Sequence, residues 1–224
     1  NYTGITITIT VLPNGCATVE TIPAPGTKPL DLSLCAVGEC RTLEANISDV
    51  PSTTSYVVSS IPYCPQAPFE NPGWFNIAPG GPIGDDDWSA PFSFPGGMQF
   101  CFFGNNYTQL NVGTNGVIAF PNPNLFAAGD FCPWSYDETV PDTNFPIKNA
   151  ILGVYQDTDF SVTPPAGVQI SVNYQVVGTY PCRKFIANFS NIPQFSCGNS
   201  IGLSTTQIVL YEVSNIIEIY VQRR

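Results

Sequence analysis

The sequence predicts an all-β fold, an antiparallel β-sandwich with long Pro/Gly-rich loops, preceded by a small β segment. Among 224 residues there are 22 prolines and 19 glycines, a frequency that suits short strands joined by turns. Several segments alternate apolar and polar residues with the period of two that indicates half-buried strands. No segment has the pattern of a helix of any length, so two packed sheets are the expected architecture.

Residues 1–45 form the small β segment. Their opening, GITITITVLP, alternates Ile and Thr and predicts a strand that ends at Pro13. We expect further short strands around Val19, Leu32 and Leu43, separated by the proline-rich IPAPGTKP, because proline cannot donate a ladder hydrogen bond. We interpret this segment as the end of a preceding Ig-like module or as a linker.

Residues 46–224 form the predicted sandwich. Strands are predicted at 54–63, in three pieces between 98 and 120, and within NAILGVYQDTDF, VQISVNYQVVG and KFIANFSNI. A closing hairpin is predicted in TQIVLYEVSNIIEIYVQ, with inward Ile217, Ile219 and Val221 and outward Glu218 and Tyr220. Two irregular stretches, 64–91 and 121–146, are long enough to be either functional or packed as Ω-loops.

The stretch FCFFGNNYTQLNVGTNGVIAF, residues 100 to 120, contains the strongest turn signal. Its Asn-Gly at 115–116 predicts a two-residue type I′ hairpin, since Asn and Gly tolerate the positive φ that both central positions need. That register pairs Val112 with Ala119 and Gly113 with Ile118, and Gly113 leaves room for its bulky neighbours. Apolar residues occur on both faces, so we expect both sides of the hairpin to be covered.

The charge balance excludes several functions. The formal net charge is −10 with only seven basic residues, which disfavours nucleic-acid binding. The chain has no histidine, so the commonest general base and transition-metal ligand are missing, and we expect no enzyme. No run of about 18 apolar residues occurs, so no membrane insertion is expected. The chain starts without Met in mid-strand, which suggests a fragment of a longer exported protein.

The cysteines are even in number and have no Cys-x-x-Cys pair, which argues against a zinc ribbon and for disulfides in an oxidising compartment. The strongest local candidate pair is Cys35 with Cys40 in CAVGEC. The sequence does not determine the other pairings, and the alternative is that some of the eight cysteines are buried thiols. The eight positions are Cys16, Cys35, Cys40, Cys64, Cys101, Cys132, Cys182 and Cys197.

Four segments together resemble nidogen-like (NIDO) extracellular domains in order and spacing. They are PFSFPGGMQFCFFGNNYTQLNVGTNGVIAF, NAILGVYQDTDF, KFIANFSNI and TTQIVLYEVSNIIEIYVQ. The phrases RTLEANI, TTSYVVSSIPY, DDDWSAPFSFP, FCPWSY and YPCRKFIANF are similar to modules of large Bacteroidota surface proteins. The chain departs from those modules at Cys64, and it lacks the Trp-Asn-x-Gly strand and sorting domain that follow in them.

The resemblance implies a non-enzymatic, extracellular, cell-surface module of an adhesin or filament, exported as type IX secretion cargo and supporting attachment or gliding. Expected partners are neighbouring modules of the same chain, surface glycans, and the secretion or motility machinery. Tandem repetition would supply avidity. The alternatives are a purely structural spacer and a carbohydrate-binding or carbohydrate-processing domain.

Two acidic clusters, Asp85-Asp86-Asp87 and Asp157-x-Asp159, are candidate calcium ligands if their segments fold together. The spacing is not that of an EF-hand, and the alternative is that these aspartates cap turns. Glycoside hydrolysis would also need two carboxylates. The candidates for that chemistry are Asp87, Asp157, Asp159 and Glu218.

Aromatic residues in the loops are candidate ligand contacts, because recognition residues often lie on loops of a rigid scaffold. The alternative, which we favour, is that the rings pack as buried anchors at the ends of the sandwich. The candidates are Trp74, Trp88, Trp134 and Tyr136.

Overall fold

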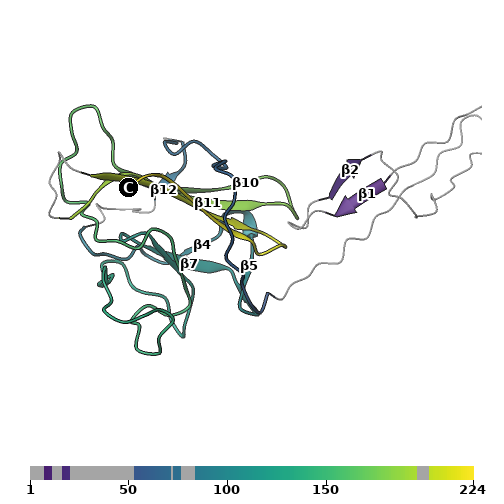
Figure 1. Ribbon diagram of the computed structural model, residues 1–224, viewed down its shortest axis with the longest axis horizontal. Helices are drawn as coiled ribbons and strands as arrows, with labels where there is room; N and C mark the ends of the chain where they lie inside the picture. The colour runs from purple at the N-terminus through teal and green to yellow at the C-terminus, as the bar shows by residue number, and fades with distance from the viewer. Residues whose placement is uncertain (1–7, 12–16, 21–52, 72, 77–83, 196–201) are drawn as a thin grey trace, which may run out of the picture.

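The computed structural model describes residues 8–11, 17–20, 53–71, 73–76, 84–195 and 202–224 (Figure 1). Strands β1 (Thr8–Val11) and β2 (Ala17–Glu20) form an antiparallel hairpin, at two of the predicted strand positions. The expected strands around Leu32 and Leu43, the boundary near residue 45 and the Cys35–Cys40 pair lie outside the described residues.

The larger sheet has five antiparallel strands in the order β13-β12-β11-β10-β3. Its three central strands are seven to ten residues long and carry apolar and β-branched side chains, which favour a pleated surface. The strands are β3 (Phe75–Asn76), β10 (Ser171–Val177), β11 (Lys184–Pro193), β12 (Leu203–Tyr211) and β13 (Ile217–Arg223).

The smaller sheet has four antiparallel strands in the order β4-β7-β8-β9. They are β4 (Phe92–Ser93), β7 (Gln109–Gly113), β8 (Val117–Ala119) and β9 (Ala150–Leu152). A separate ribbon pairs β5 (Phe100–Phe102) with β6 (Asn105–Tyr107). The one helical turn of the described residues is the 3₁₀ turn Pro95–Gly97, and no described helix could cross a membrane.

The two sheets enclose the main hydrophobic core, which confirms the all-β sandwich (Figure 1). Alternate residues of each inner strand face this core, as the two-residue period requires. The larger sheet supplies Phe185, Ala187, Phe189, Ile208 and Leu210, and the smaller sheet and its ribbon supply Phe100, Leu110, Val112, Ile118, Phe120 and Ile151.

Each sheet is also covered on its outer face by chain that forms little regular structure. Ala67, Phe69 and Trp74 pack on outer residues of the larger sheet such as Val209. Side chains from the 121–147 region pack in the same way on Val117 and Ala119 of the smaller sheet. The expectation that both sides of the β7–β8 hairpin are covered is therefore confirmed, and much of the two long loops is packed.

The predicted hairpin register is wrong by one residue. Val112 pairs with Ile118 and Gly113 with Val117, so the loop has three residues, and the Gly116 N–H donates to Gly113 O. Gly116 alone of the loop has positive φ, at 78°, as in a type I turn closed by a left-handed residue. Gly113 makes room for the Cys132 sulfur and the Trp88 ring on the outer face, not for Ile118.

The predicted strand at 54–63 has no sheet partner among the described residues. Val57 and Val58 are 92% and 97% exposed, although Tyr56 packs against Phe102. In the closing hairpin, Ile217 packs on the core as expected, but Ile219 and Val221, also predicted to face inward, are 37% and 42% exposed. Tyr220, predicted to face outward, is only 4% exposed. Tyr220 is buried because the segment containing Gln66 covers the face that we expected to be open to solvent.

Candidate metal centre

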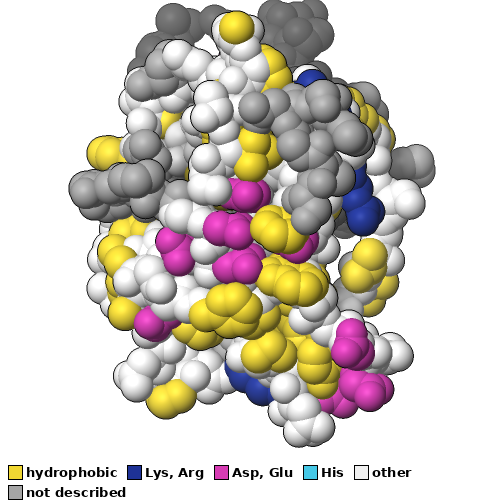
Figure 2. Space-filling view, turned by 90° about the vertical axis from the view of Figure 1, so that its left-hand side faces the viewer, with side chains coloured by type: hydrophobic (Ala, Val, Ile, Leu, Met, Phe, Trp, Pro, Cys, Tyr) yellow, Lys and Arg dark blue, Asp and Glu magenta, His cyan; other side chains and the backbone are white. Residues whose placement is uncertain are grey.

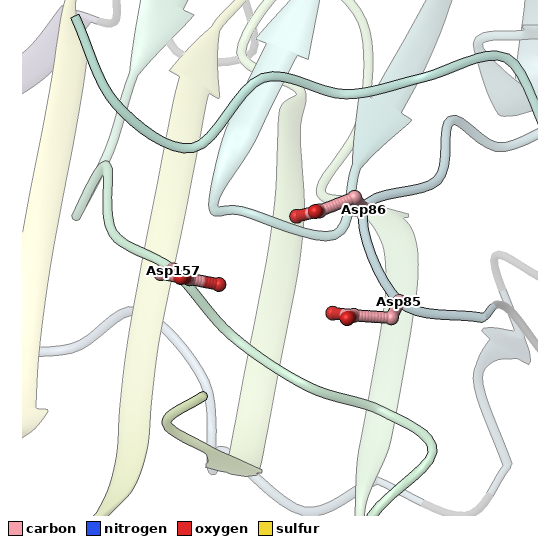
Figure 3. Close-up of side chains that lie close together, drawn as sticks. All are labelled: Asp85, Asp86 and Asp157. Carbon is pink, nitrogen blue, oxygen red and sulfur yellow. The ribbon is translucent and has the colours of Figure 1, made fainter. Parts of the chain in front are cut away.

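Three carboxylates from two distant segments converge at one end of the sandwich (Figure 3). Asp85 and Asp86 precede the buried Trp88, whereas Asp157 lies in the segment that follows β9. One carboxylate oxygen of each residue lies within 4.8 Å of those of the other two. The segments GDDDWS and QDTDF thus fold together, which was the condition for calcium binding.

Asn115 joins the two acid-bearing segments through its buried side chain. Its Nδ2 donates to Asp86 Oδ1 at 2.7 Å and to Cys132 O at 2.9 Å. Its Oδ1 accepts from Thr158 N at 3.0 Å, while the Thr158 hydroxyl donates to Thr114 O at 2.9 Å. Both amide protons and the amide oxygen of Asn115 are used, so this one side chain sets the separation of Asp86 from the residue after Asp157.

The backbone around the acids is also fixed. Asp86 has φ of 54°, a left-handed conformation that Asp tolerates better than most residues, and its carbonyl accepts from Cys132 N. On the other segment, Phe195 N donates to Asp157 O at 3.2 Å. Both acids therefore project from anchored backbone.

The other two predicted ligands are turn caps, as the alternative interpretation held. Asp87 Oδ2 accepts from Gly84 N at 2.8 Å. Asp159 Oδ1 accepts from the N–H and the hydroxyl of Ser161. Such bonds to nearby residues are the ordinary use of aspartate in turns, so these two residues do not belong to the group of three.

The three carboxylates repel one another, and no described Lys or Arg forms an ion pair with them. Desolvation, followed by the charges of Asp159, Asp86 and Asp157, raises the pKa of Asp85 to about 6. Desolvation and the neighbouring charges of Asp86 and Asp159 also raise the pKa of Asp157. Among the described residues the one ion pair joins Arg183 to Glu212, away from this group. One oxygen each of Asp85 and Asp157 is buried without a hydrogen bond from a described residue.

This arrangement can hold a divalent cation. Calcium prefers carboxylate, carbonyl and water oxygens in flexible geometry, and a positive ion would offset the repulsion that raises the two pKa values. Figure 2 shows a face of the molecule on which acidic side chains gather beside hydrophobic ones.

A family comparison matches the NIDO-related family over residues 75–224, more than half of the chain. The chain belongs to the NIDO-related family. The matched range contains both sheets and all three converging acids. Comparisons with curated proteins and with solved structures give no significant match.

The cysteines of this NIDO-related chain differ in part from the expected full pairing. Cys64, Cys101 and Cys132 are free thiols, the last two buried, while Cys182 is disulfide-bonded. Cys132 packs with Trp88 in the outer cluster of the smaller sheet, where burial raises the pKa of its thiol to about 12. Cys132 thus acts as a small apolar side chain, whereas Cys101 Sγ accepts a hydrogen bond from Thr53 N at 3.4 Å. Cys16, Cys35, Cys40 and Cys197 lie outside the described residues.

The loop aromatics are mostly anchors in this NIDO-related module. Trp88 is buried and stacks on Phe126, and Trp74 packs in the outer cluster of the larger sheet. Tyr136 packs edge-on against Phe145 and donates its hydroxyl to Asp142. Trp134, 41% exposed, remains the one predicted aromatic contact with a large accessible surface.

Sequence reasoning missed Asn115 as the residue that organises the site. The Thr-Asn-Gly tripeptide correctly indicated a turn. Hairpin loops of two and of three residues are both common, and the structure has the three-residue loop. Nothing in the local sequence indicates that the amide is buried or that its partners lie 29 and 43 residues away.

Proposed function

We propose that this NIDO-related chain is a non-enzymatic, extracellular module of a large cell-surface adhesin or filament, and that calcium stabilises one end of it. The observation that carries the calcium part is the convergence of Asp85, Asp86 and Asp157 with buried, unpartnered oxygens. A bound cation would join the segment before Trp88 to the segment after β9.

The adhesin part rests on family membership together with the motif resemblance. The sequence phrases shared with Bacteroidota surface modules favour type IX secretion and a role in attachment or gliding. Calcium sites of extracellular modules work at about 10⁻⁴–10⁻³ M, a range that suits three carboxylates on partly exposed loops. Neighbouring modules, surface glycans and the motility machinery are the proposed partners.

Calcium binding is tested by thermal unfolding of the purified chain in EDTA, in millimolar Ca²⁺ and in millimolar Mg²⁺. We expect Ca²⁺ to raise the melting temperature and Mg²⁺ to raise it less, because Mg²⁺ demands a stricter octahedral geometry. Asp157→Asn should abolish the Ca²⁺ effect, while Asp137→Asn, an exposed acid outside the group, should retain it. Equal melting temperatures in EDTA and Ca²⁺ would refute the metal centre.

Adhesion is tested in the source organism by deleting the module in frame from its parent protein. We expect secretion to continue and attachment to fall. A spacer of equal length from an unrelated β-sandwich is the control, because a purely structural module would be replaced without loss. Full attachment with the replacement would favour the spacer hypothesis.

A carbohydrate-processing enzyme stays as the second candidate because of one observation. The raised pKa of Asp85 is what a general acid near neutral pH requires. Glu218, by contrast, accepts hydrogen bonds from Tyr211 and Tyr220 and is not one of the converging acids. Hydrolysis of a glycan substrate that Asp85→Asn abolishes would establish the enzyme and displace the adhesin proposal.

A further inference from the structure

A second concave site lies between the β5–β6 ribbon and the β12–β13 turn, and it shares no residue with the metal centre. It is a pocket of about 250 Å³. Its walls come from four separate stretches of chain, which meet only in the folded molecule. The lining residues are Gly97, Gln99, Cys101, Asn106, Tyr180, Arg183, Glu212, Val213 and Asn215.

The charged part of the wall is internally neutralised. Arg183 donates from Nε to Glu212 Oε2 at 2.6 Å and from Nη2 to the other carboxylate oxygen. The same guanidinium donates to the carbonyls of Gly96 and Gly97. A paired arginine and glutamate leave no net charge for a ligand to neutralise, so the pocket suits an uncharged ligand.

The β12–β13 turn, which lines the pocket, has a strained backbone. Val213 has φ of 66° and Asn215 has φ of 55°. A β-branched residue in the left-handed region is a genuine outlier, and such strain gathers at functional sites. Asn215 Oδ1 accepts from Cys101 N at 3.0 Å, which fixes the turn against the ribbon.

The accessible groups of the pocket are uncharged and polar. Three polar groups that line the pocket have no hydrogen-bond partner among the described residues: the amides of Gln99 and Asn106 and the hydroxyl of Tyr180. Gln99 and Asn106 are also exposed, so a ligand can reach them. Amides and phenols can both donate and accept. The Tyr180 ring is 71% exposed and carries the Arg183 guanidinium at 5.6 Å from its centroid.

We propose that this pocket binds a neutral saccharide unit. Its hydroxyls would bond to the amides of Gln99 and Asn106, and its apolar ring face would lie on Tyr180. The volume of about 250 Å³ lies below the range of about 300–1,000 Å³ that drug-sized ligands occupy, which fits one sugar ring at the end of a glycan. A saccharide site would name the ligand class of the proposed adhesin, so the biological role of the pocket rests on the adhesin proposal. Saccharide binding itself needs no calcium, because the pocket shares no residue with the metal centre.

The test is calorimetric titration of the purified chain with glucose, galactose, mannose and N-acetylglucosamine, each in Ca²⁺ and in EDTA. We expect at least one sugar to bind equally well in both buffers. Tyr180→Ala and Asn106→Ala should each weaken it by about tenfold, equivalent to one good contact. Phe131→Ala, an exposed aromatic that does not line the pocket, is the matched control.

Three results would overturn the proposal: no binding of any of the four sugars, binding that Tyr180→Ala leaves unchanged, or binding that EDTA abolishes. The last result would move the ligand to the metal centre. Sugar binding without a calcium effect on melting temperature would support the pocket while refuting the metal centre, so the two proposals fail separately.

Discussion

Asn115 shows how one buried amide can organise a functional end of a sandwich. It is fully buried, and its bonds reach Asp86 on one side and Thr158 on the other. A buried polar network stabilises a unique arrangement when every member is satisfied and costs free energy when one is not. The hydrogen bonds of Asn115 therefore hold Asp86 and the residue after Asp157 in a fixed arrangement.

Replacing Asn115 with Ala should lower both stability and calcium affinity. The change leaves the Cys132 carbonyl and the Thr158 N–H without partners, at a cost of roughly 3 kcal/mol in the free energy of unfolding. Urea unfolding with and without Ca²⁺ measures both effects. Asn124→Ala, at an exposed loop position, is the control. A variant that loses stability but binds Ca²⁺ like wild type would show that Asn115 does not position the ligands.

The raised pKa of Asp85, about 6 against an ordinary 3.8, gives two opposite pH effects. In calcium-free protein, folding favours the protonated acid, so this stabilisation is complete below about pH 4 and is lost as the pH rises through about 6. Calcium requires the carboxylate, so its affinity should fall as the pH drops below about 6.

Melting temperatures between pH 4 and pH 7, with and without Ca²⁺, measure both effects. We expect the stabilisation by Ca²⁺ to be large at pH 7 and small at pH 5. Asp85→Asn should flatten the calcium-free profile over that interval. A Ca²⁺ effect of equal size at pH 5 and pH 7 contradicts the assignment.

How far the sequence predicts the site depends on the distance over which each signal acts. Aspartates that cluster within three residues are a local signal, so Asp85, Asp86 and Asp157 could be named in advance. The sequence could not show that Asp87 and Asp159 are excluded from the group, because that depends on which carboxylates cap their own turns. The role of Asn115 depends on contacts distant in sequence and is invisible to local patterns.

At the scale of elements, the sequence predicts strand positions and the two hairpins, but not the exact register. Apolar patterns and turn residues predicted β7, β8, β10, β11, β12 and β13 near their observed places, and the β7–β8 and β12–β13 pairs are confirmed. The β7–β8 register depends on the loop length, which is three residues rather than the predicted two. The 54–63 stretch has the composition of a strand, yet among the described residues no neighbour offers it a sheet edge.

Glycine substitutions test the close approach of the hairpin loop to the following segment. A Cβ on Gly116 would lie 2.5 Å from Val154 O, whereas one on Gly129 would meet nothing within 4 Å. The two glycines have nearly the same φ, 78° and 80°, so strain of about 1–2 kcal/mol is common to both. Gly116→Ala should lower the free energy of unfolding by more than about 3 kcal/mol, whereas Gly129→Ala should lower it only by the shared strain. Urea unfolding of both variants measures the difference. Equal losses would remove the steric argument.

For the whole molecule, the covered outer faces make the two sheets interior layers. Burial on both sides explains the long apolar runs in β8 and β12, where alternation alone would predict polar outward residues. It also explains why Cys132, which was predicted as a disulfide partner, is a buried thiol in the outer cluster of the smaller sheet.

The accessibility of the thiols can be measured by alkylation and peptide mass spectrometry. In native protein we expect rapid modification of Cys64, which is exposed, and protection of Cys101 and Cys132. The pKa of Cys132, raised to about 12 by burial, adds to its protection because only the thiolate reacts. Denaturant should expose all three sites. Native labelling of Cys132 at the rate of Cys64 would contradict the packing of the outer cluster.

The placement of β13 has a mechanical consequence. Thr53 is hydrogen-bonded to the β5–β6 ribbon through Gly104 and Cys101. The turn before β13 is hydrogen-bonded to the same ribbon, because Asn215 Oδ1 accepts from Cys101 N. Tension applied between Thr53 and Arg224 would therefore act along β13, from the end next to this turn to the end next to the C-terminus. Because ladder hydrogen bonds lie perpendicular to the strands, such tension would load the β12–β13 bonds together in shear rather than one after another.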